Sequence, residues 1–436
     1  MKTNKKTRIF EIAVCLVAIV ATVLVFRHYT QRRDKLIAEW YPTQTYGFST
    51  KYEFGEGSVW LSDEELQSYQ AKTDVYNSGV CYNLLSSEEK IVYNALEYAW
   101  DNNYSYIYIV EDAGYQGGRE VTDIIALMSA DSPMLQQNVD YSVWETGMIF
   151  SEYIMGKTVE KDIPGTIVEI DNFTKTRTDK ALAAVEEAKK IKLDFTEAKA
   201  DSEKARIIYD YIVENIEYYD DPKNESYVDD DHLYDALTQK KTICDGFSNA
   251  FALLCNMNGI SCFEKTYNPE EEKNTEKATE DATEDAPTDE NNSADEDTGH
   301  TWCVVNLDGK WYNVDVTNVK NKDGEVDEIW STYFFGFSDD LQFYENDYAD
   351  ILPKCEKSLF TNYIVVENYD DFVSTVGDAI IETENNKLYV GVNNFEYDNN
   401  DEYEDYLQDL VYYTNSSVYS QTKETEYMRI HHFTLK

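Results

Sequence analysis

Three residues of this chain have the types and the order needed for acyl-transfer chemistry. They are a cysteine, Cys244, a histidine, His300, and an aspartate, Asp315. In a thiol acyl-transfer site, a base activates the thiol and a carboxylate orients the base. Chemistry of this kind requires no metal and no organic cofactor. The elements around the three residues must therefore bring them together.

The segment after the cysteine has the pattern of a helix. Apolar residues such as Phe247 and Phe251 recur at helical spacing, and Gly259 is suited to end a helix, so we predict a helix over 246–258. Cys244 then lies at the helix N-terminus, where unpaired N–H groups and the helix dipole favour the thiolate. We therefore expect Cys244 to react with iodoacetamide near pH 6. The same N–H groups are suited to hold an oxyanion.

A second local pattern places the histidine and the aspartate. Two apolar, β-branched runs flank the Asp-Gly pair at 308–309, which predicts a tight hairpin. Residues at equal distance from the turn pair, so Trp302 faces Asp315, and His300 is a diagonal neighbour of Asp315 within side-chain reach. Cys303 points to the opposite face of the strand.

Three motifs around these residues follow one another in order. They are Cys-x-Gly-Phe at 244–247, Gly-His-x-Trp at 299–302 and Trp-Tyr-x-Val-Asp at 311–315. In this combination the chain resembles the transglutaminase-like superfamily in its bacterial, membrane-anchored form, over about residues 200 to 337. The resemblance implies an α+β fold with a transglutaminase/papain-like core. In that core, the helix carrying the cysteine packs on an antiparallel sheet carrying the histidine and the aspartate.

The resemblance also implies the roles of the three residues. Cys244 is the nucleophile, His300 the base and Asp315 the orienting carboxylate. The chain departs from the family at Cys303, where asparagine is frequent, and at Asn318, where an aromatic residue is common. Both departures leave the triad intact and bear on substrate preference.

Three further residues are candidates for binding the substrate or an oxyanion. Asp245 and Gly246 follow the cysteine directly, and Trp302 follows the histidine by two positions. His232 is open to two interpretations, a second polar group near the site or, as we favour, a loop or helix-cap residue. The seven cysteines form no CxxC pair, which excludes a zinc site and a disulfide framework.

The predicted function is an extracytoplasmic thiol acyl-transfer enzyme that acts on amide bonds of peptides or proteins. Cross-linking, deamidation and hydrolysis share the same triad, so the acceptor stays open between an amine, water and another nucleophile. One alternative is a cell-surface cysteine peptidase with cell-wall or surface peptides as substrates. An alternative of another class is a non-catalytic surface protein that uses the same fold for binding, against which the intact triad argues.

Charge excludes one class of partner. The chain has 38 Lys and Arg against 84 Asp and Glu, a net charge of −46. Such a chain repels nucleic acid. A charge of −11 lies at 268–299, from 13 Asp and Glu and two Lys. This segment has almost no apolar residues, so we predict a disordered acidic insertion.

The N-terminal segment is typical of a membrane anchor. Cationic residues precede an apolar run from Ile9 to Phe26, which is close to the length that spans a bilayer. The alternative is a cleaved signal peptide, but Val25-Phe26-Arg27-His28 is a poor cleavage site. We predict a single-pass cell-membrane protein whose catalytic part is extracytoplasmic.

Composition and pattern divide the chain into five predicted parts. These are a membrane anchor (1–30), a stalk or lead-in (31–80), an α/β accessory domain (81–172), the transglutaminase-like domain (176–355) with its insertion, and a second α/β accessory domain (356–436).

Overall fold

The computed structural model describes residues 5–54, 57–71, 76–110, 119–135, 141–170, 175–219, 231–267, 299–317, 319–320, 324–339, 351–359, 363–366, 372–382, 387–393, 400–414, 418–424 and 428–435. Two compact units make up the chain. The first consists of Met1–Gln70, Ser87–Arg119 and Asp140–Thr174, and the second of Ala71–Ser86, Glu120–Val139 and Lys175–Lys436. The chain passes between the units several times, and the five predicted domain boundaries remain predictions.

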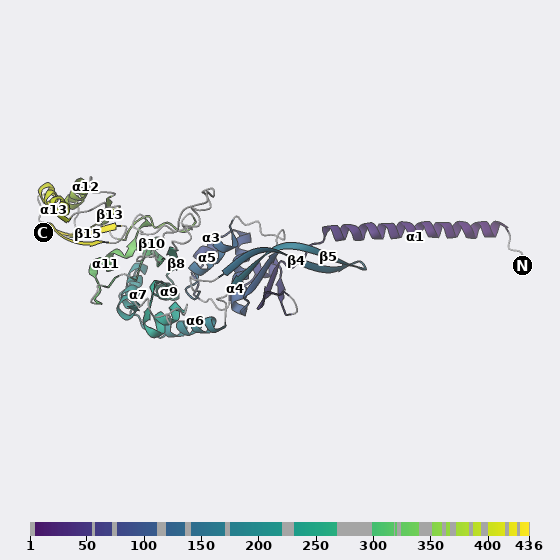
Figure 1. Cartoon of the computed structure of the whole chain (residues 1–436), viewed down its shortest axis with the longest axis horizontal. Coiled ribbons are helices and arrows are strands. Elements are labelled where there is room, and N and C mark those ends of the chain that lie inside the picture. The colour runs from purple at the N-terminus through teal and green to yellow at the C-terminus, as the bar shows by residue number, and fades with distance from the viewer. Residues whose placement is uncertain are drawn as a thin grey trace, which may run out of the picture. The chain divides into compact units, whose positions relative to one another are not determined.

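An antiparallel sheet forms the centre of the first unit, with the strand order β2-β1-β3-β5-β4. Figure 1 labels its two long strands, β4 and β5. Its strands are β1 (Tyr46–Ser49), β2 (Val59–Leu61), β3 (Tyr106–Val110), β4 (Tyr141–Ile154) and β5 (Lys157–Ile170), and the helices of this unit are α1 (Lys5–Glu39), α2 (Asp63–Gln67) and α4 (Ser87–Asn102). Tyr108, Ile163 and Ile167 are buried on one face of the sheet, where Trp60 and Phe150 pack against them. Because that core needs aromatic residues from β2 and β4, it forms only when distant segments pair.

The sequence did not indicate two features of the first unit. The segment 31–80, expected to be a stalk or lead-in, supplies strands β1 and β2 to the sheet. These strands are short and show little alternation, so the pairing of β1 with β3 forms them rather than local pattern. The second feature is the length of β4 and β5, which are 14 residues each.

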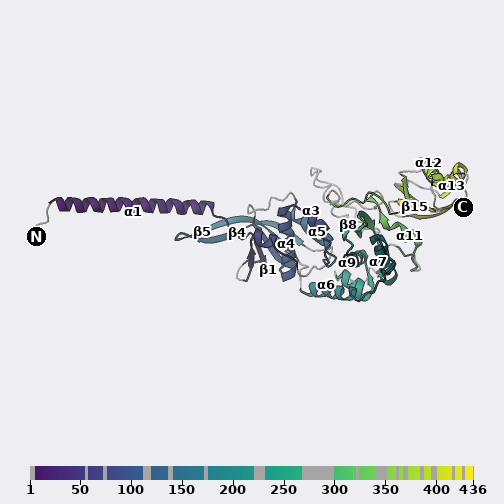
Figure 2. The same cartoon turned by 180° about the vertical axis from the view of Figure 1, so that it is seen from behind.

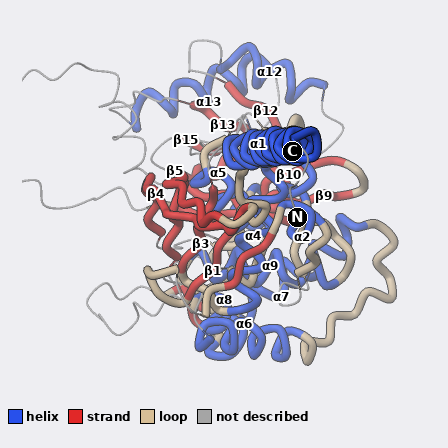
Figure 3. The backbone as a smooth tube through the Cα atoms, turned by 90° about the vertical axis from the view of Figure 1, so that its right-hand side faces the viewer, coloured by secondary structure: helices blue, strands red, loops and turns tan. Residues whose placement is uncertain are grey.

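The second unit, which contains the predicted site, is built from both helices and strands. Its helical elements up to residue 337 are α3 (Val80–Leu84), α5 (Val121–Asp131), α6 (Lys175–Ala188), α7 (Asp201–Asn215), α8 (His232–Tyr234), the π-helical turn η2 (Asp235–Gln239), α9 (Cys244–Met257) and α11 (Glu328–Tyr333). The strands are β6 (Glu217–Tyr218), β7 (Lys241–Thr242), β8 (Cys262–Tyr267), β9 (His300–Leu307), β10 (Lys310–Val314) and β11 (Phe335–Phe337). Strands β8 to β11 form an antiparallel sheet with the order β11-β10-β9-β8. Helices α6 to α9 gather in one region of the backbone (Figure 3).

Helix α9 is the buried centre of this unit. Every residue from Cys244 to Cys255 is buried, and the helix packs on β8 and β9 on one side and on α7 and α8 on others. The helix begins two residues before the predicted start of 246. Gly259, with φ of 77°, follows its end, and the Ile260 N–H donates to the Cys255 carbonyl oxygen at 3.0 Å. A glycine adopts this left-handed backbone without strain.

The predicted hairpin of β9 and β10 is confirmed. Lys310 pairs with Leu307 and Val314 with Cys303, which is the register that the Asp-Gly turn predicts. Asp308 and Gly309 both have positive φ, 53° and 85°, as a tight hairpin turn requires.

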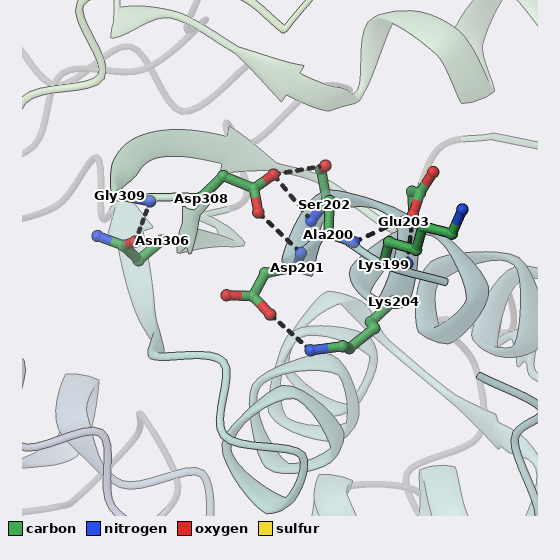
Figure 4. A network of polar contacts seen from close by, with 9 residues as sticks. All are labelled: Lys199, Ala200, Asp201, Ser202, Glu203, Lys204, Asn306, Asp308 and Gly309. Atoms are coloured by element: carbon green, nitrogen blue, oxygen red, sulfur yellow. Dashed lines mark hydrogen bonds and ion pairs between the residues drawn. The ribbon is translucent and has the colours of Figure 1, made fainter. Parts of the chain in front are cut away.

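The Asp308 carboxylate also caps helix α7, which the sequence did not indicate (Figure 4). It accepts hydrogen bonds from the Asp201 N–H at 2.8 Å and from the Ser202 hydroxyl at 2.7 Å. These hydrogen bonds lower the pKa of Asp308. A carboxylate at a helix N-terminus satisfies unpaired N–H groups and complements the dipole. The turn of the hairpin is therefore attached to α7, which packs against α9.

A second four-stranded sheet lies at the C-terminal end of the chain, with the order β12-β13-β15-β14. Its elements are β12 (Tyr363–Val366), α12 (Phe372–Glu382), β13 (Lys387–Asn393), α13 (Asn400–Thr414), β14 (Val418–Glu424) and β15 (Met428–Leu435). Phe372, Val376, Val390 and Phe433 are buried in its core. Of the predicted acidic insertion, all but Gly299 lies outside the described residues.

Candidate active site

Cys244 is the first residue of α9, as the predicted helix N-terminus requires. Its side chain is nearly enclosed, since the residue is 9% exposed. Sγ lies 3.8 Å from Oδ1 of Asp245, the next residue of the helix. The thiol therefore has the N-terminal N–H groups of a helix on one side and a carboxylate beside it.

His300 and Asp315 meet as the hairpin register predicts. Nε2 of His300, the first residue of β9, lies 2.8 Å from Oδ2 of Asp315, which directly follows β10. The other carboxylate oxygen of Asp315 accepts a hydrogen bond from the Thr317 N–H at 2.8 Å. This second contact holds the carboxylate in place, and a carboxylate held in this way stabilises a positive charge on the imidazole.

The electrostatics of the thiol differ from the sequence-based expectation. Burial raises the pKa of Cys244 above its ordinary value, and the Asp245 charge adds to this, although hydrogen bonds from His300 and the Thr301 N–H act in the opposite direction. The expected thiolate near pH 6 is therefore wrong. The free energy lost when the thiolate is removed from water exceeds the free energy gained from the hydrogen bond and charge of His300.

His300 titrates far from its ordinary range. Burial acts to lower its pKa, but the charge of Asp315 and hydrogen bonds to Asp315 and Cys244 outweigh burial and raise the pKa to about 10. The thiol and the imidazole titrate as a pair. Asp315 therefore favours the protonated, imidazolium form of His300.

A pH profile of alkylation tests these electrostatics. The rate of Cys244 modification by iodoacetamide is expected to rise through the alkaline range, with its midpoint above the value of about 8.5 for a free thiol. His300→Ala removes a hydrogen bond and a charge that lower the thiol pKa, so the midpoint should move higher still. Mass spectrometry of the Cys244 peptide measures both rates. Full reactivity of Cys244 at pH 6 would contradict the dominance of burial.

Trp302 supports the histidine rather than facing outward. Its ring stacks on His300 with centroids 6.2 Å apart and an interplanar angle of 16°, and the residue is 2% exposed. Its Nε1 donates to Oδ1 of Asn313 at 3.0 Å, and Nδ2 of Asn313 donates to Asp339 at 3.0 Å. A ring enclosed in this way fixes the plane of the imidazole.

Asp245 and Gly246 contact the buried elements that surround the site. The Asp245 carboxylate accepts a hydrogen bond from the Thr301 hydroxyl. At Gly246, an added Cβ would lie 2.1 Å from Oγ1 of Thr242 and 2.5 Å from the His232 carbonyl oxygen. The absence of a side chain therefore lets the start of α9 approach β7 and α8.

His232 was expected to be a loop or helix-cap residue, but it lies at the site. It is buried at the start of α8, and its Nε2 lies 3.9 Å from Oδ2 of Asp245. The preceding residue, Asp231, pairs with Lys180 of α6. The sequence carried no spacing signal for this contact, because α8 and α9 are brought together only by packing.

Three other buried cysteines of the second unit, Cys255, Cys262 and Cys303, come from α9, β8 and β9. Cys303 lies on the face of β9 opposite to His300, as predicted, and its Sγ donates to the Ser248 carbonyl oxygen of α9 at 3.2 Å. Cys255 and Cys262 are fully buried near it, which raises the pKa of Cys262. Within the described ranges, no group of three His, Cys, Asp or Glu side chains is arranged to hold a metal ion.

Comparison with known proteins identifies the segment that carries this site. The model of the transglutaminase-like superfamily matches residues 189–316. Kyphoscoliosis peptidase from Homo sapiens is 29% identical over 143 residues, which cover 33% of this chain and 19% of that protein. The chain thus spans about a fifth of the length of this relative.

Two solved structures are similar at lower identity. One is described as a TGase, with 16% identity, a TM-score of 0.21 and coverage of 41% of this chain and 46% of the other. The second, a candidate cysteine protease from Cytophaga hutchinsonii, has 16% identity, a TM-score of 0.19 and coverage of 43% and 68%. From its match to the family model and to the human relative, the segment 189–316 belongs to the transglutaminase-like superfamily.

Proposed function

We propose that this chain is a thiol acyl-transfer enzyme that acts on amide bonds of peptides or proteins. The observation that supports this most strongly is the line of three groups, in which Asp315 contacts His300 at 2.8 Å and His300 hydrogen-bonds the Cys244 thiol. Three separate elements supply these groups. A nucleophile, a base and an orienting carboxylate in this order are the requirements of acyl transfer.

The proposed reaction has two steps. The Cys244 thiolate attacks the carbonyl carbon, and N–H groups at the start of α9 stabilise the oxyanion. The C–N bond then breaks, the His300 imidazolium gives its proton to the leaving amine, and a thioester remains on Cys244. In the second step an acceptor gives a proton to His300 and attacks the thioester, the C–S bond breaks, and the Cys244 thiolate is restored beside the His300 imidazolium.

The acceptor in the second step decides the class of enzyme. An amine gives cross-linking and water gives deamidation or hydrolysis, all with the same residues. A cysteine peptidase is the second candidate, and the name of the human relative, a peptidase, supports it. Substrates of either enzyme are peptides or proteins, and peptides of the cell wall are one class within reach of a surface enzyme.

We also propose that the chain is anchored in the cell membrane with its catalytic part on the outer side. Helix α1 supports this, because Ala13–Glu39 has a mean hydropathy of 1.9 in its most apolar window and none of that window is buried. That length and hydropathy suit a membrane span. The net charge of −46 favours neutral or basic partners over nucleic acid.

Incubation of the full chain in detergent with a defined peptide mixture tests the proposed function. The mixture contains glutamine, asparagine and lysine peptides, and mass spectrometry follows loss of ammonia, gain of water and new cross-links. We expect at least one of these changes with the native protein and none with Cys244→Ala. No change in any peptide at any pH up to 10, despite alkylation of Cys244, would favour the non-catalytic binding protein.

A further inference from the structure

The tip of the β4–β5 hairpin lies beside helix α1. Both Figure 1 and Figure 2 show the hairpin reaching alongside the C-terminal part of α1. The Tyr29 hydroxyl of α1 donates to the Met155 carbonyl oxygen at the tip, at 2.8 Å. A Cβ added to Gly156 would lie 3.9 Å from the Tyr29 hydroxyl and 4.0 Å from the Tyr153 hydroxyl. Two tyrosine hydroxyls, one from the helix and one from the hairpin, therefore converge on the turn.

Because the tip contacts Tyr29, the position of Tyr29 along α1 indicates how deep the tip lies relative to a membrane that contains α1. The apolar run from Ile9 to Phe26 rises about 1.5 Å per residue, or roughly 27 Å in all, which is close to the thickness of a hydrocarbon core. Tyr29 lies three residues beyond this run, about 4.5 Å further along the axis. That level is the headgroup layer, where tyrosine is enriched because its ring is apolar and its hydroxyl is polar.

The side chains at the tip suit this layer. Tyr153 is 69% exposed, and Lys157 is exposed on the adjoining end of β5. Arg27 is exposed on α1 near the same level. An exposed tyrosine ring with neighbouring cations matches the interface, in which acyl chains meet phosphate groups.

We propose that the β4–β5 tip is a second membrane-contact site of this chain, in which Tyr153 and Lys157 touch lipid headgroups. The lipid surface is the one in which α1 is embedded, so the inference rests on the proposed anchoring and not on the proposed catalysis. Attachment at both the helix and the tip restricts tilting of the first unit relative to the membrane plane. A single anchoring helix would leave that tilting unopposed.

Photo-crosslinking of the full chain in lipid nanodiscs tests the contact. A benzophenone amino acid replaces Val20 within the span, Tyr153 at the tip, or Ile149. Ile149 is a matched control, because it is 70% exposed on the same face of β4 but lies four residues, about 14 Å, further from the tip. Circular dichroism confirms that each protein is folded before irradiation, and mass spectrometry counts lipid adducts.

Lipid adducts are expected at positions 20 and 153, with at least a tenfold lower yield at position 149. Adducts at position 20 with no more at 153 than at 149 would overturn the tip contact and leave the anchor in place. Absence of lipid adducts at all three positions would overturn both the anchor and the contact. Neither result depends on Cys244 chemistry, so failure here is distinct from failure of the proposed enzyme.

Discussion

Cys244→Ala is expected to lower turnover by a factor on the order of 10⁶, the scale of loss when the nucleophile of a serine protease triad is removed. No other described cysteine can replace it. Cys81, Cys255, Cys262, Cys303 and Cys355 are at most 1% exposed, and the exposed Cys15 lies within the apolar part of α1. The rate of product formation in the peptide assay measures the loss.

Cys303→Ala is the matched control for this change. It removes a thiol of the same core, but one that contacts the Ser248 carbonyl on the face of β9 away from His300. We expect a small packing cost and nearly unchanged turnover. If Cys303→Ala abolished turnover while the protein stayed folded, or if Cys244→Ala kept a tenth of the native rate, the assignment of the nucleophile would fail.

Asp315→Asn is expected to lower turnover by a factor on the order of 10⁴, as the corresponding change does in a serine protease triad. The amide is nearly the same size as the carboxylate, and its oxygen can still accept the Thr317 N–H, so the fold should persist. What is lost is the negative charge that stabilises the imidazolium. The pKa of His300, raised to about 10 in the native protein, should therefore fall.

Two measurements separate this effect from misfolding. Nitrogen-15 NMR of the imidazole rings, with His300→Ala to assign the signal, follows the pKa directly. Asp308→Asn is the matched control, since Asp308 is a carboxylate of the same hairpin that caps α7 and does not touch the triad. A His300 pKa that stayed near 10 in Asp315→Asn, or an equal loss of turnover in Asp308→Asn, would contradict the proposed role.

Local features of the sequence were enough to predict the two elements that carry the site, the β9–β10 hairpin and helix α9. An Asp-Gly pair accepts the positive φ values of a tight turn, so the register of β9 and β10 followed from two residues. The helical spacing after Cys244 and the glycine at 259 likewise predicted α9 to within two residues at its start. These predictions held because neighbouring residues alone determine a turn and a helix end.

Burial and long-range packing decided what the sequence left open. The thiol pKa is raised because α9 is enclosed on several sides, and no pattern near Cys244 encodes that enclosure. His232 reaches Asp245 only because Gly246 allows α8 and α9 to approach closely.

The first unit shows the same division between local and distant determinants. Strand β1 forms by pairing with β3, and β2 forms by pairing with β1. The tip of β4–β5 contacts Tyr29, which is more than a hundred residues away in the sequence. The sequence by itself determined the three groups, their order and the hairpin that joins two of them. The tertiary structure alone decided how far each group is removed from water, because desolvation depends on every element that packs around a site.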